Sequence, residues 1–316
     1  MIERREELVT VFGGDGFIGR YVCEALLKAG VRVRVACRNP RLAHFIQPLG
    51  QVGQFGFVKA DITHAGSTRA AVQGAAAVVN LVGAFRYMTA INVDGARNVA
   101  EAARDAGAGS LVHISAIGAD AESEAEYGCT KGRGEQAVRK AFPEATIIRP
   151  SLVFGPEDQL TNRFAAMASG SRSLPVVAAK RLFQPVYVRD LAQAVASAAL
   201  DPGTHAGKTY EIGGPQVMTF RELNEQIVKA AGLDTDVVEL PDIAGSIISR
   251  FGWLPGAPMT RDQWLMLQRD NVPADGAPGL EAFGIRATPL AAVAPDWLGM
   301  YSGSRFARRR VNIAAQ

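Results

Sequence analysis

A glycine-rich turn between an apolar strand and a helix-like segment constrains the fold most. Residues 8–12 read LVTVF, and glycines follow at positions 13, 16 and 19. In such a turn the first glycine allows a tight bend, the second lets backbone approach a pyrophosphate, and the third lets helix and strand pack closely. The start of the next helix adds free N–H groups that suit a phosphate. The sequence therefore predicts a dinucleotide-binding turn formed by Gly13, Gly14, Asp15, Gly16, Phe17, Ile18 and Gly19.

The chain then alternates between strand-like and helix-like segments. The expected strands are 31–36, 55–59, 77–81, 110–115 and 145–149, and the expected helices are 21–29, 68–72, 88–106 and 127–142. This alternation is typical of right-handed crossovers and predicts an α/β fold with a doubly wound parallel sheet. We expect the dinucleotide-binding domain to span residues 1–155 and to be completed by segments from about 184–213.

A smaller, mostly helical C-terminal domain is expected at 156–316, with a partner-binding tail from about 240. A helix at 219–231 is predicted because Thr219 and Glu222 have the spacing of a capping box. The apolar stretch 243–254 is either a helix facing a partner or membrane surface, or a core helix. The segment 305–310 carries four arginines and no acid, so it either contacts an acidic partner or anionic lipid, or is simply solvated.

Composition excludes several classes of function. The chain has 34 basic and 31 acidic residues among 316, and a net charge of +3 is too small to indicate a nucleic-acid partner. Its three cysteines lack metal-binding or disulfide-framework spacing, and its four histidines are scattered, so no metal is expected. No apolar run is long enough to cross a membrane. The first expected strand begins at Leu8, which leaves no room for a targeting segment.

The end of the second expected strand bears on which nucleotide is bound. NAD sites usually place Asp or Glu there to bind the ribose 2′-hydroxyl, whereas this chain has Cys37 followed by Arg38. A guanidinium can bind a 2′-phosphate that a carboxylate would repel. The sequence therefore predicts NADPH (NADP) as the cofactor, with an ordinary surface arginine as the alternative.

Further cofactor contacts are expected where the next two strands end. Asp61 can accept a hydrogen bond from the adenine amino group while Ile62 covers the ring; the alternative is an ordinary N-capping aspartate. Leu81, Val82 and Gly83 would bring backbone close to the cofactor ribose, or they are simply the exit of a core strand.

Tyr127 and Lys131 are four residues apart in an expected helix and so share one face. A lysine ammonium beside a tyrosine lowers the pKa of the phenol, which suits proton transfer, and the lysine can also hold the nicotinamide ribose.

Together these residues resemble the short-chain dehydrogenase/reductase superfamily, in its extended or atypical branch. The resemblance implies a Rossmann fold and a nicotinamide nucleotide in contact with Ser115, Tyr127 and Lys131. If the protein is active, the same three residues would be catalytic, with Tyr127 as the general acid/base. Active members of this branch carry a hydroxyl at the end of the fifth strand that stabilises developing charge, and depending on the register this position is held here by Ser115 or by Ala116. The segment 149–155 (RPSLVFG) is expected to pack beside the nicotinamide, which adds Pro150 and Val153 to the predicted cofactor contacts.

A narrower resemblance covers nearly the whole chain. The segments 141–151 (AFPEATIIRPS), 260–263 (TRDQ) and 278–290 (PGLEAFGIRATPL) are similar to the family of NAD(P)H-binding accessory subunits of respiratory complex I. This resemblance implies tight NADPH binding without established turnover, and a role in stabilising the peripheral arm near its junction with the membrane arm.

The partners implied are other subunits of the peripheral arm, with membrane surface or lipid near the C-terminal region. The place implied is the cytoplasmic face of a bacterial inner membrane, or the matrix side in a mitochondrion. The alternative is an NADPH-dependent reductase or epimerase that acts on a small carbonyl compound or a nucleotide sugar.

Overall fold

The computed structural model describes residues 7–250, 252 and 259–302, and the chain divides into two compact units. The first unit contains the described residues up to Pro150, together with Val188–Ile212 and Asp275–Arg286. The second contains Ser151–Tyr187, Gly213–Ala274 and the described residues from Ala287 on. The segment Asp275–Arg286 thus belongs to the nucleotide-binding unit although it lies far along the chain.

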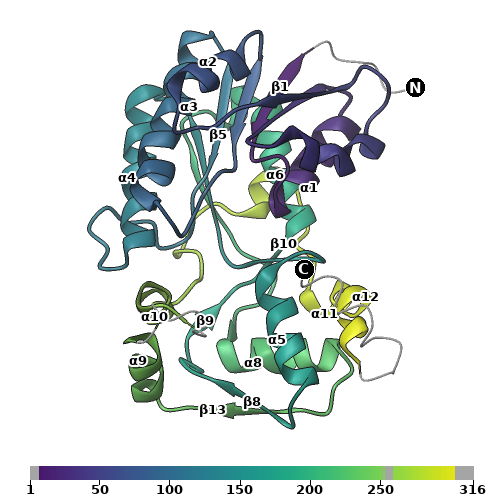
Figure 1. Ribbon diagram of the computed structural model, residues 1–316, viewed down its shortest axis with the longest axis vertical. Coiled ribbons are helices and arrows are strands. Elements are labelled where there is room, and N and C mark those ends of the chain that lie inside the picture. Colours follow the sequence, from purple (N-terminus) through teal and green to yellow (C-terminus); the bar gives the residue numbers. More distant parts are fainter. Residues whose placement is uncertain (1–6, 251, 253–258, 303–316) are drawn as a thin grey trace. The chain divides into compact units, whose positions relative to one another are not determined.

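The first unit is built on a seven-stranded sheet of order β11-β6-β5-β4-β1-β2-β3, in which every pairing is parallel. Figure 1 shows β1 and β5 of this sheet. Its strands are β1 (Leu8–Phe12), β2 (Arg32–Cys37), β3 (Phe55–Lys59), β4 (Ala77–Asn80), β5 (Ser110–Ile114), β6 (Thr146–Pro150) and β11 (Thr209–Ile212). The order reverses at β1, so β1 and β4 end at the point where doubly wound sheets bind their ligands. The predicted fold class is confirmed.

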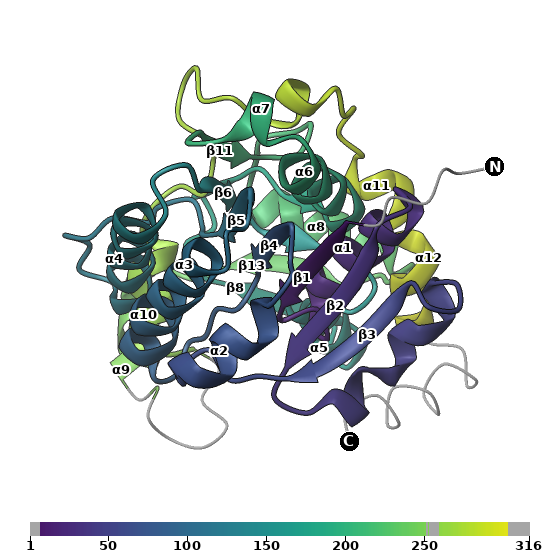
Figure 2. The same cartoon turned by 90° about the horizontal axis from the view of Figure 1, so that it is seen from above.

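Helices cover both faces of this sheet, as expected for parallel strands that are apolar on both sides. Figure 2 shows α2, α3 and α4 on one face, with α1 and α6 on the other. Their bounds are α1 (Phe17–Lys28), α2 (Ala65–Val72), α3 (Ala96–Asp105), α4 (Glu126–Ala141) and α6 (Val188–Leu200). Shorter helical segments complete the unit, namely η1 (Pro40–Leu49), η2 (Thr89–Gly95), α7 (Pro202–His205) and η3 (Leu280–Phe283).

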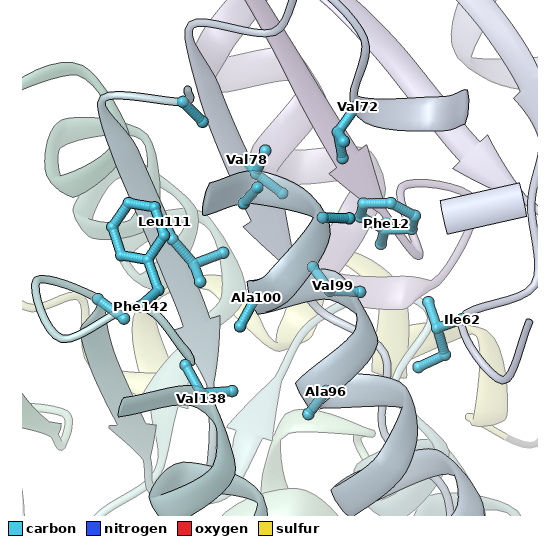
Figure 3. Close-up of a cluster of buried hydrophobic side chains, with 14 of the residues drawn as sticks. Phe12, Ile62, Val72, Val78, Ala96, Val99, Ala100, Leu111, Val138 and Phe142 are labelled. Atoms are coloured by element: carbon cyan, nitrogen blue, oxygen red, sulfur yellow. The ribbon is translucent and has the colours of Figure 1, made fainter. Parts of the chain in front are cut away.

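The main hydrophobic core lies between the sheet and the layer formed by α3 and α4. Phe12 and Leu111 from the sheet are 1% exposed, and they belong to the same cluster as Val99 on α3 and Val138 on α4 (Figure 3). Side chains of this size contribute about 1.5–3 kcal/mol each when fully buried. This packing holds the ends of β1, β4 and β5 in a fixed arrangement.

The predicted helix at 88–106 is two elements, because a turn of π-helix, η2, precedes α3. A π-turn widens the backbone and often lies at a functional site. Here it places Asn92, which is 1% exposed, inside the protein. Conversely, α1 begins at Phe17, four residues before its expected start, because the helix follows directly from the glycine turn.

The second unit has a smaller core. Phe154, Phe183 and Phe220 form its centre, around which short strands and helices are arranged. The strands are β7 (Val153–Phe154), β8 (Ser173–Val176), β9 (Leu182–Phe183), β10 (Val186–Tyr187), β12 (Met218–Thr219) and β13 (Asp236–Glu239). The helices are α5 (Gln159–Ser169), α8 (Phe220–Ala230), α9 (Asp242–Arg250), α10 (Arg261–Leu267), α11 (Leu290–Val293), α12 (Pro295–Leu298) and η4 (Gly299–Tyr301).

Two predictions for this unit can be compared with the structure. The capping box of Thr219 and Glu222 opens α8 as expected. The apolar stretch 243–254 is helical as far as Arg250, with Ile243 and Ile247 exposed by 71% and 53%. Trp253 and the arginine-rich segment 305–310 lie outside the described residues, so the partner-binding tail stays a prediction.

Within the described part of the chain, no helix is both long and apolar enough to cross a membrane. The same residues contain no cluster of three or more potential metal ligands. Cys23, Cys37 and Cys129 are free thiols.

Candidate functional site

The glycine turn closes on itself more tightly than a turn with side chains could. Gly13 has a φ of +76°, which favours glycine, and its N–H donates to the carbonyl of Ala36 at 3.1 Å. A Cβ on Gly19 would lie 2.1 Å from the carbonyl oxygen of Gly13 and 2.6 Å from the Cα of Gly14. The third glycine therefore allows α1 to pack directly on the turn.

The first turn of α1 is left open for an anion. Its N-cap is Gly16, which offers no side-chain acceptor, and there is no acidic residue among the first helical positions. The first backbone N–H groups of a helix have no partner within the helix and carry the positive end of its dipole. The backbone of the turn and the N-terminus of α1 therefore have the chemistry to hold a pyrophosphate, with the carboxylate of Asp15 close by, and the contacts of residues 13–19 stay a prediction.

The end of β4 lies against this turn. A Cβ on Gly13 would meet Val82 Cγ2 at 3.2 Å and the backbone of Leu81 at 3.5 Å. One residue further, a Cβ on Gly83 would lie 3.7 Å from the Nζ of Lys131. The structure therefore brings the glycine turn, residues 81–83 and Lys131 together at one edge of the sheet, although they lie far apart in the sequence.

The two predicted contacts to the adenosine half also lie near each other. β2 and β3 are paired with Cys37 opposite Lys59, so the exposed Arg38 follows one strand where Asp61 follows the other. Hydrogen bonds from Thr63 lower the pKa of Asp61, and the charge of Arg38 adds to this effect. Asp61 Oδ1 accepts from the Thr63 N–H at 2.9 Å, so this carboxylate also holds its own turn. Ile62 is buried and packs against Gly95.

Tyr127 and Lys131 both lie on α4, but their electrostatics differ from the expectation. The Nζ of Lys131 donates to the carbonyl of Ile114 at 2.6 Å, and burial lowers the lysine pKa to about 8 although Glu135 opposes this shift. Desolvation raises the pKa of Tyr127 to about 12. The predicted lowering of the phenol pKa is therefore wrong, because burial disfavours the charged phenolate.

Ser115 directly follows β5. It is 3% exposed, and its Oγ has no hydrogen-bond partner among the described residues. A buried hydroxyl without a partner is costly, so it marks a position where a ligand group would be bound favourably. The neighbouring Ala116 has no such group to offer.

Pro150 ends β6, and its carbonyl accepts from the N–H of Ile117 at 3.1 Å, so it lies in the same unit as the turn. Val153 belongs to the second unit, where β7 pairs with β10. The expectation that Val153 contacts the cofactor stays a prediction.

Three polar residues near this site were not predicted. Asn80 Nδ2 lies 3.2 Å from His113 Nδ1, and Asn80 Oδ1 accepts from the N–H of Val82, which fixes the exit of β4. Burial lowers the pKa of His113 well below its usual value, so its ring is neutral. Asn92 binds both backbone groups of Ala84. A polar side chain inside an apolar strand is the signal that could have revealed Asn80 and His113.

The chain is similar to known proteins over most of its length. Residues 9–213 match the model of the NAD dependent epimerase/dehydratase family. The chain is 34% identical to NADH dehydrogenase (ubiquinone) 1 alpha subcomplex subunit 9, mitochondrial, of Rattus norvegicus over 295 aligned residues. The alignment covers 90% of this chain and 77% of that protein. It is 27% identical to a ceramide reductase of Caulobacter vibrioides over 305 residues, covering 94% of this chain and 92% of the reductase.

Among solved structures, an NADPH-dependent quinone oxidoreductase of Escherichia coli in complex with NADPH superposes with a TM-score of 0.74. The two chains are 21% identical, and the match covers 91% of this chain and 99% of the oxidoreductase. A likeness at this level of identity shows the shared fold.

Proposed function

Because this chain belongs to the NAD dependent epimerase/dehydratase family, and to the family of subunit 9 of mitochondrial NADH dehydrogenase, we propose that it is an NADPH-binding accessory subunit of respiratory complex I. The observation that carries the proposal is the relationship to subunit 9, at 34% identity against 27% for the ceramide reductase. It spans nine-tenths of the chain, so it includes both units and not the nucleotide-binding unit alone. The partners are then other subunits of the peripheral arm.

The nucleotide serves here to stabilise the fold. A dinucleotide that binds only the folded state shifts the unfolding equilibrium by mass action. The open first turn of α1 would hold its pyrophosphate, and Ser115, Tyr127 and Lys131 would surround the nicotinamide ribose. Bound nicotinamide supplies hydride chemistry in this family, and we propose that this chain does not use it for turnover. The protein would lie peripherally on the cytoplasmic face of a bacterial inner membrane, or on the matrix side in a mitochondrion.

Isolation of the respiratory complex tests this role. When the tagged full chain is expressed at its natural level and membranes are solubilised in a mild detergent, we expect the chain to migrate with NADH:quinone oxidoreductase activity. Deletion of the gene should lower the amount of assembled complex, and re-expression should restore it. If the chain migrates apart from the complex and deletion leaves assembly unchanged, the proposal is wrong.

Arg38 is proposed to select the phosphorylated nucleotide, since its guanidinium is exposed at the end of β2. For Arg38→Asp we expect the Kd for NADPH to rise about 100-fold, because a charge-assisted contact is replaced by repulsion. The Kd for NADH should change much less. Arg69→Asp makes the same charge change on the exposed side of α2 and should leave both constants unaltered. Titration calorimetry measures the four values, and equal losses for NADPH and NADH in Arg38→Asp would contradict the assignment.

A second function is favoured by one observation, the similarity to a ceramide reductase along nearly the entire chain. In that case the protein would be an NADPH-dependent reductase or epimerase of a small carbonyl compound or nucleotide sugar. Tyr127 would be its general acid/base and Ser115 would orient the substrate oxygen.

A further inference from the structure

The loop that follows β4 places an aromatic ring directly on Tyr127. The rings of Phe85 and Tyr127 have centroids 4.2 Å apart and an interplanar angle of 17°, so one face of the tyrosine lies against the phenylalanine. Phe85 keeps 55% of its surface exposed. An apolar ring left half in water gains little from burial, so packing of the core does not explain why this side chain lies here.

The contact between the two rings is fixed by a chain of hydrogen bonds. Asn92 Oδ1 accepts from the N–H of Ala84, and Asn92 Nδ2 donates to the carbonyl of Ala84, both at 3.0 Å. Asn92 Nδ2 also lies 3.1 Å from Thr130 Oγ1, and this hydroxyl donates to the carbonyl of Tyr127 at 3.1 Å. The residue before Phe85 is therefore tied to the helical turn that carries Tyr127.

The backbone of the loop is strained in a way that supports this placement. Tyr87, two residues after Phe85, has a φ of +53°, a region that non-glycine residues rarely adopt. Such strain persists where the surroundings fix the conformation. The side chain of Tyr87 itself is 83% exposed, so the strain is not offset by its burial. The loop thus holds an unfavourable bend two residues after Phe85.

We propose that Phe85 is a positioning residue that covers Tyr127 and keeps small carbonyl compounds away from it. The inference rests on the proposed function and deepens it, because it gives a physical reason why a chain with Ser115, Tyr127 and Lys131 binds a nucleotide without turnover. Phe85 excludes water from one face of the phenol and adds to the desolvation that raises its pKa. A phenol with a raised pKa is a weaker proton donor near neutral pH.

Chemical nitration of the full chain tests whether Phe85 shields Tyr127, and it does not depend on enzymatic activity. Tetranitromethane modifies tyrosines that are accessible and able to ionise, and peptide mass spectrometry resolves each site. For Phe85→Ala we expect nitration of Tyr127 to be about 10-fold faster than in the wild type, equivalent to about 1.4 kcal/mol. Phe85→Tyr keeps an aromatic ring at this position, so nitration of Tyr127 should be as slow as in the wild type.

The loop offers a matched control and a reserve variant. Tyr87→Ala removes a neighbouring aromatic side chain that is not stacked on Tyr127, so it should leave nitration of Tyr127 unchanged. Phe85→Leu keeps apolar volume without a planar ring, and it replaces Phe85→Ala if the latter does not fold by circular dichroism. Nitration of Tyr127 in Phe85→Leu should also be faster than in the wild type. If folded Phe85→Ala or Phe85→Leu shows the wild-type rate at Tyr127, the inference is wrong.

Turnover gives an independent readout on the nucleotide-loaded chain. NADPH oxidation with a panel of small carbonyl compounds should rise above the wild-type level in Phe85→Ala and return to it in Phe85→Ala combined with Tyr127→Phe. A rise that survives the second substitution would contradict a role through Tyr127. Migration with the respiratory complex is measured separately on the wild type, so the accessory role and the role of Phe85 can fail independently.

Discussion

Replacing Gly19 with alanine is expected to lower the free energy of unfolding by about 3 kcal/mol, at the upper end of the range for overpacking substitutions. The added methyl group would lie 2.1 Å from the carbonyl oxygen of Gly13, and backbone cannot move aside as a flexible side chain can. Either α1 moves away from the turn or the turn opens. Urea unfolding followed by circular dichroism gives the change in stability.

The same substitution should weaken nucleotide binding. If the turn relieves its strain by opening, binding must close it again, and a cost of about 3 kcal/mol corresponds to a rise in Kd of about 100-fold. Gly66→Ala is the matched control, because a Cβ on Gly66 meets nothing within 4 Å and this glycine lies in the first turn of α2. It should leave binding unchanged and raise stability by as much as about 1 kcal/mol. Equal stabilities of the two variants would contradict the packing argument.

Replacing Arg149 with methionine is expected to be similarly costly, for an electrostatic reason. Arg149 donates to Glu135 through Nε at 2.9 Å and through Nη2 at 2.7 Å, and to Glu211 through Nη1 at 3.1 Å. The three groups join α4, β6 and β11, and the side chains of Glu135 and Glu211 are only 6% and 14% exposed. Both carboxylates raise the pKa of Arg149, as expected for a tightly paired cation.

Without the guanidinium, the buried Glu135 and the partly buried Glu211 both lose the cation that Arg149 supplies. Breaking a buried pair in this way typically costs about 3–5 kcal/mol. Arg104→Met is the control, because Arg104 lies 2.7 Å from Asp105 in a pair whose side chains are about half exposed. Exposed pairs contribute about 0–1 kcal/mol, so this variant should stay close to the wild type. Thermal and urea unfolding compare the two, and a similar loss in both would mean that burial of the pair is irrelevant.

The ion-pair partners of Arg149 could not be predicted from the sequence. The resemblance predicts that the segment 149–155 packs beside the nicotinamide, and it says nothing of the pairing of the Arg149 side chain with Glu135 and Glu211. Glu135 is 14 residues away and Glu211 is 62 residues away, so no local spacing relates the three. Only the pairing of β6 with β11 brings them together.

The fold itself could be predicted because its signals are local. Strand runs alternate with helical segments along the first 150 residues, and each crossover of this kind has only one favourable handedness. The glycine turn could be predicted for the same reason, since steric limits on backbone approach act between neighbours in the chain. Gly13, Gly16 and Gly19 therefore form the turn at the start of α1, as the sequence predicts.

The chemical state of the site could not be predicted in this way. The spacing of Tyr127 and Lys131 indicated a phenol with a lowered pKa, yet burial raises that pKa to about 12 and lowers the pKa of the lysine to about 8. Desolvation depends on every atom that surrounds a group, and most of these atoms come from distant parts of the chain. Phe85, which follows β4 and lies 42 residues before Tyr127, stacks on the Tyr127 ring.

By itself, then, the sequence determined the order of strands and helices, the glycine turn and the family, because each depends on contacts between near neighbours or on patterns of apolar residues. Only the tertiary structure decided that Lys131 donates to Ile114, that Asn92 ties the Phe85 loop to α4, and that the segment Asp275–Arg286 belongs to the first unit. These features depend on contacts across long stretches of chain, and their energies arise only when packing has excluded water from the groups involved.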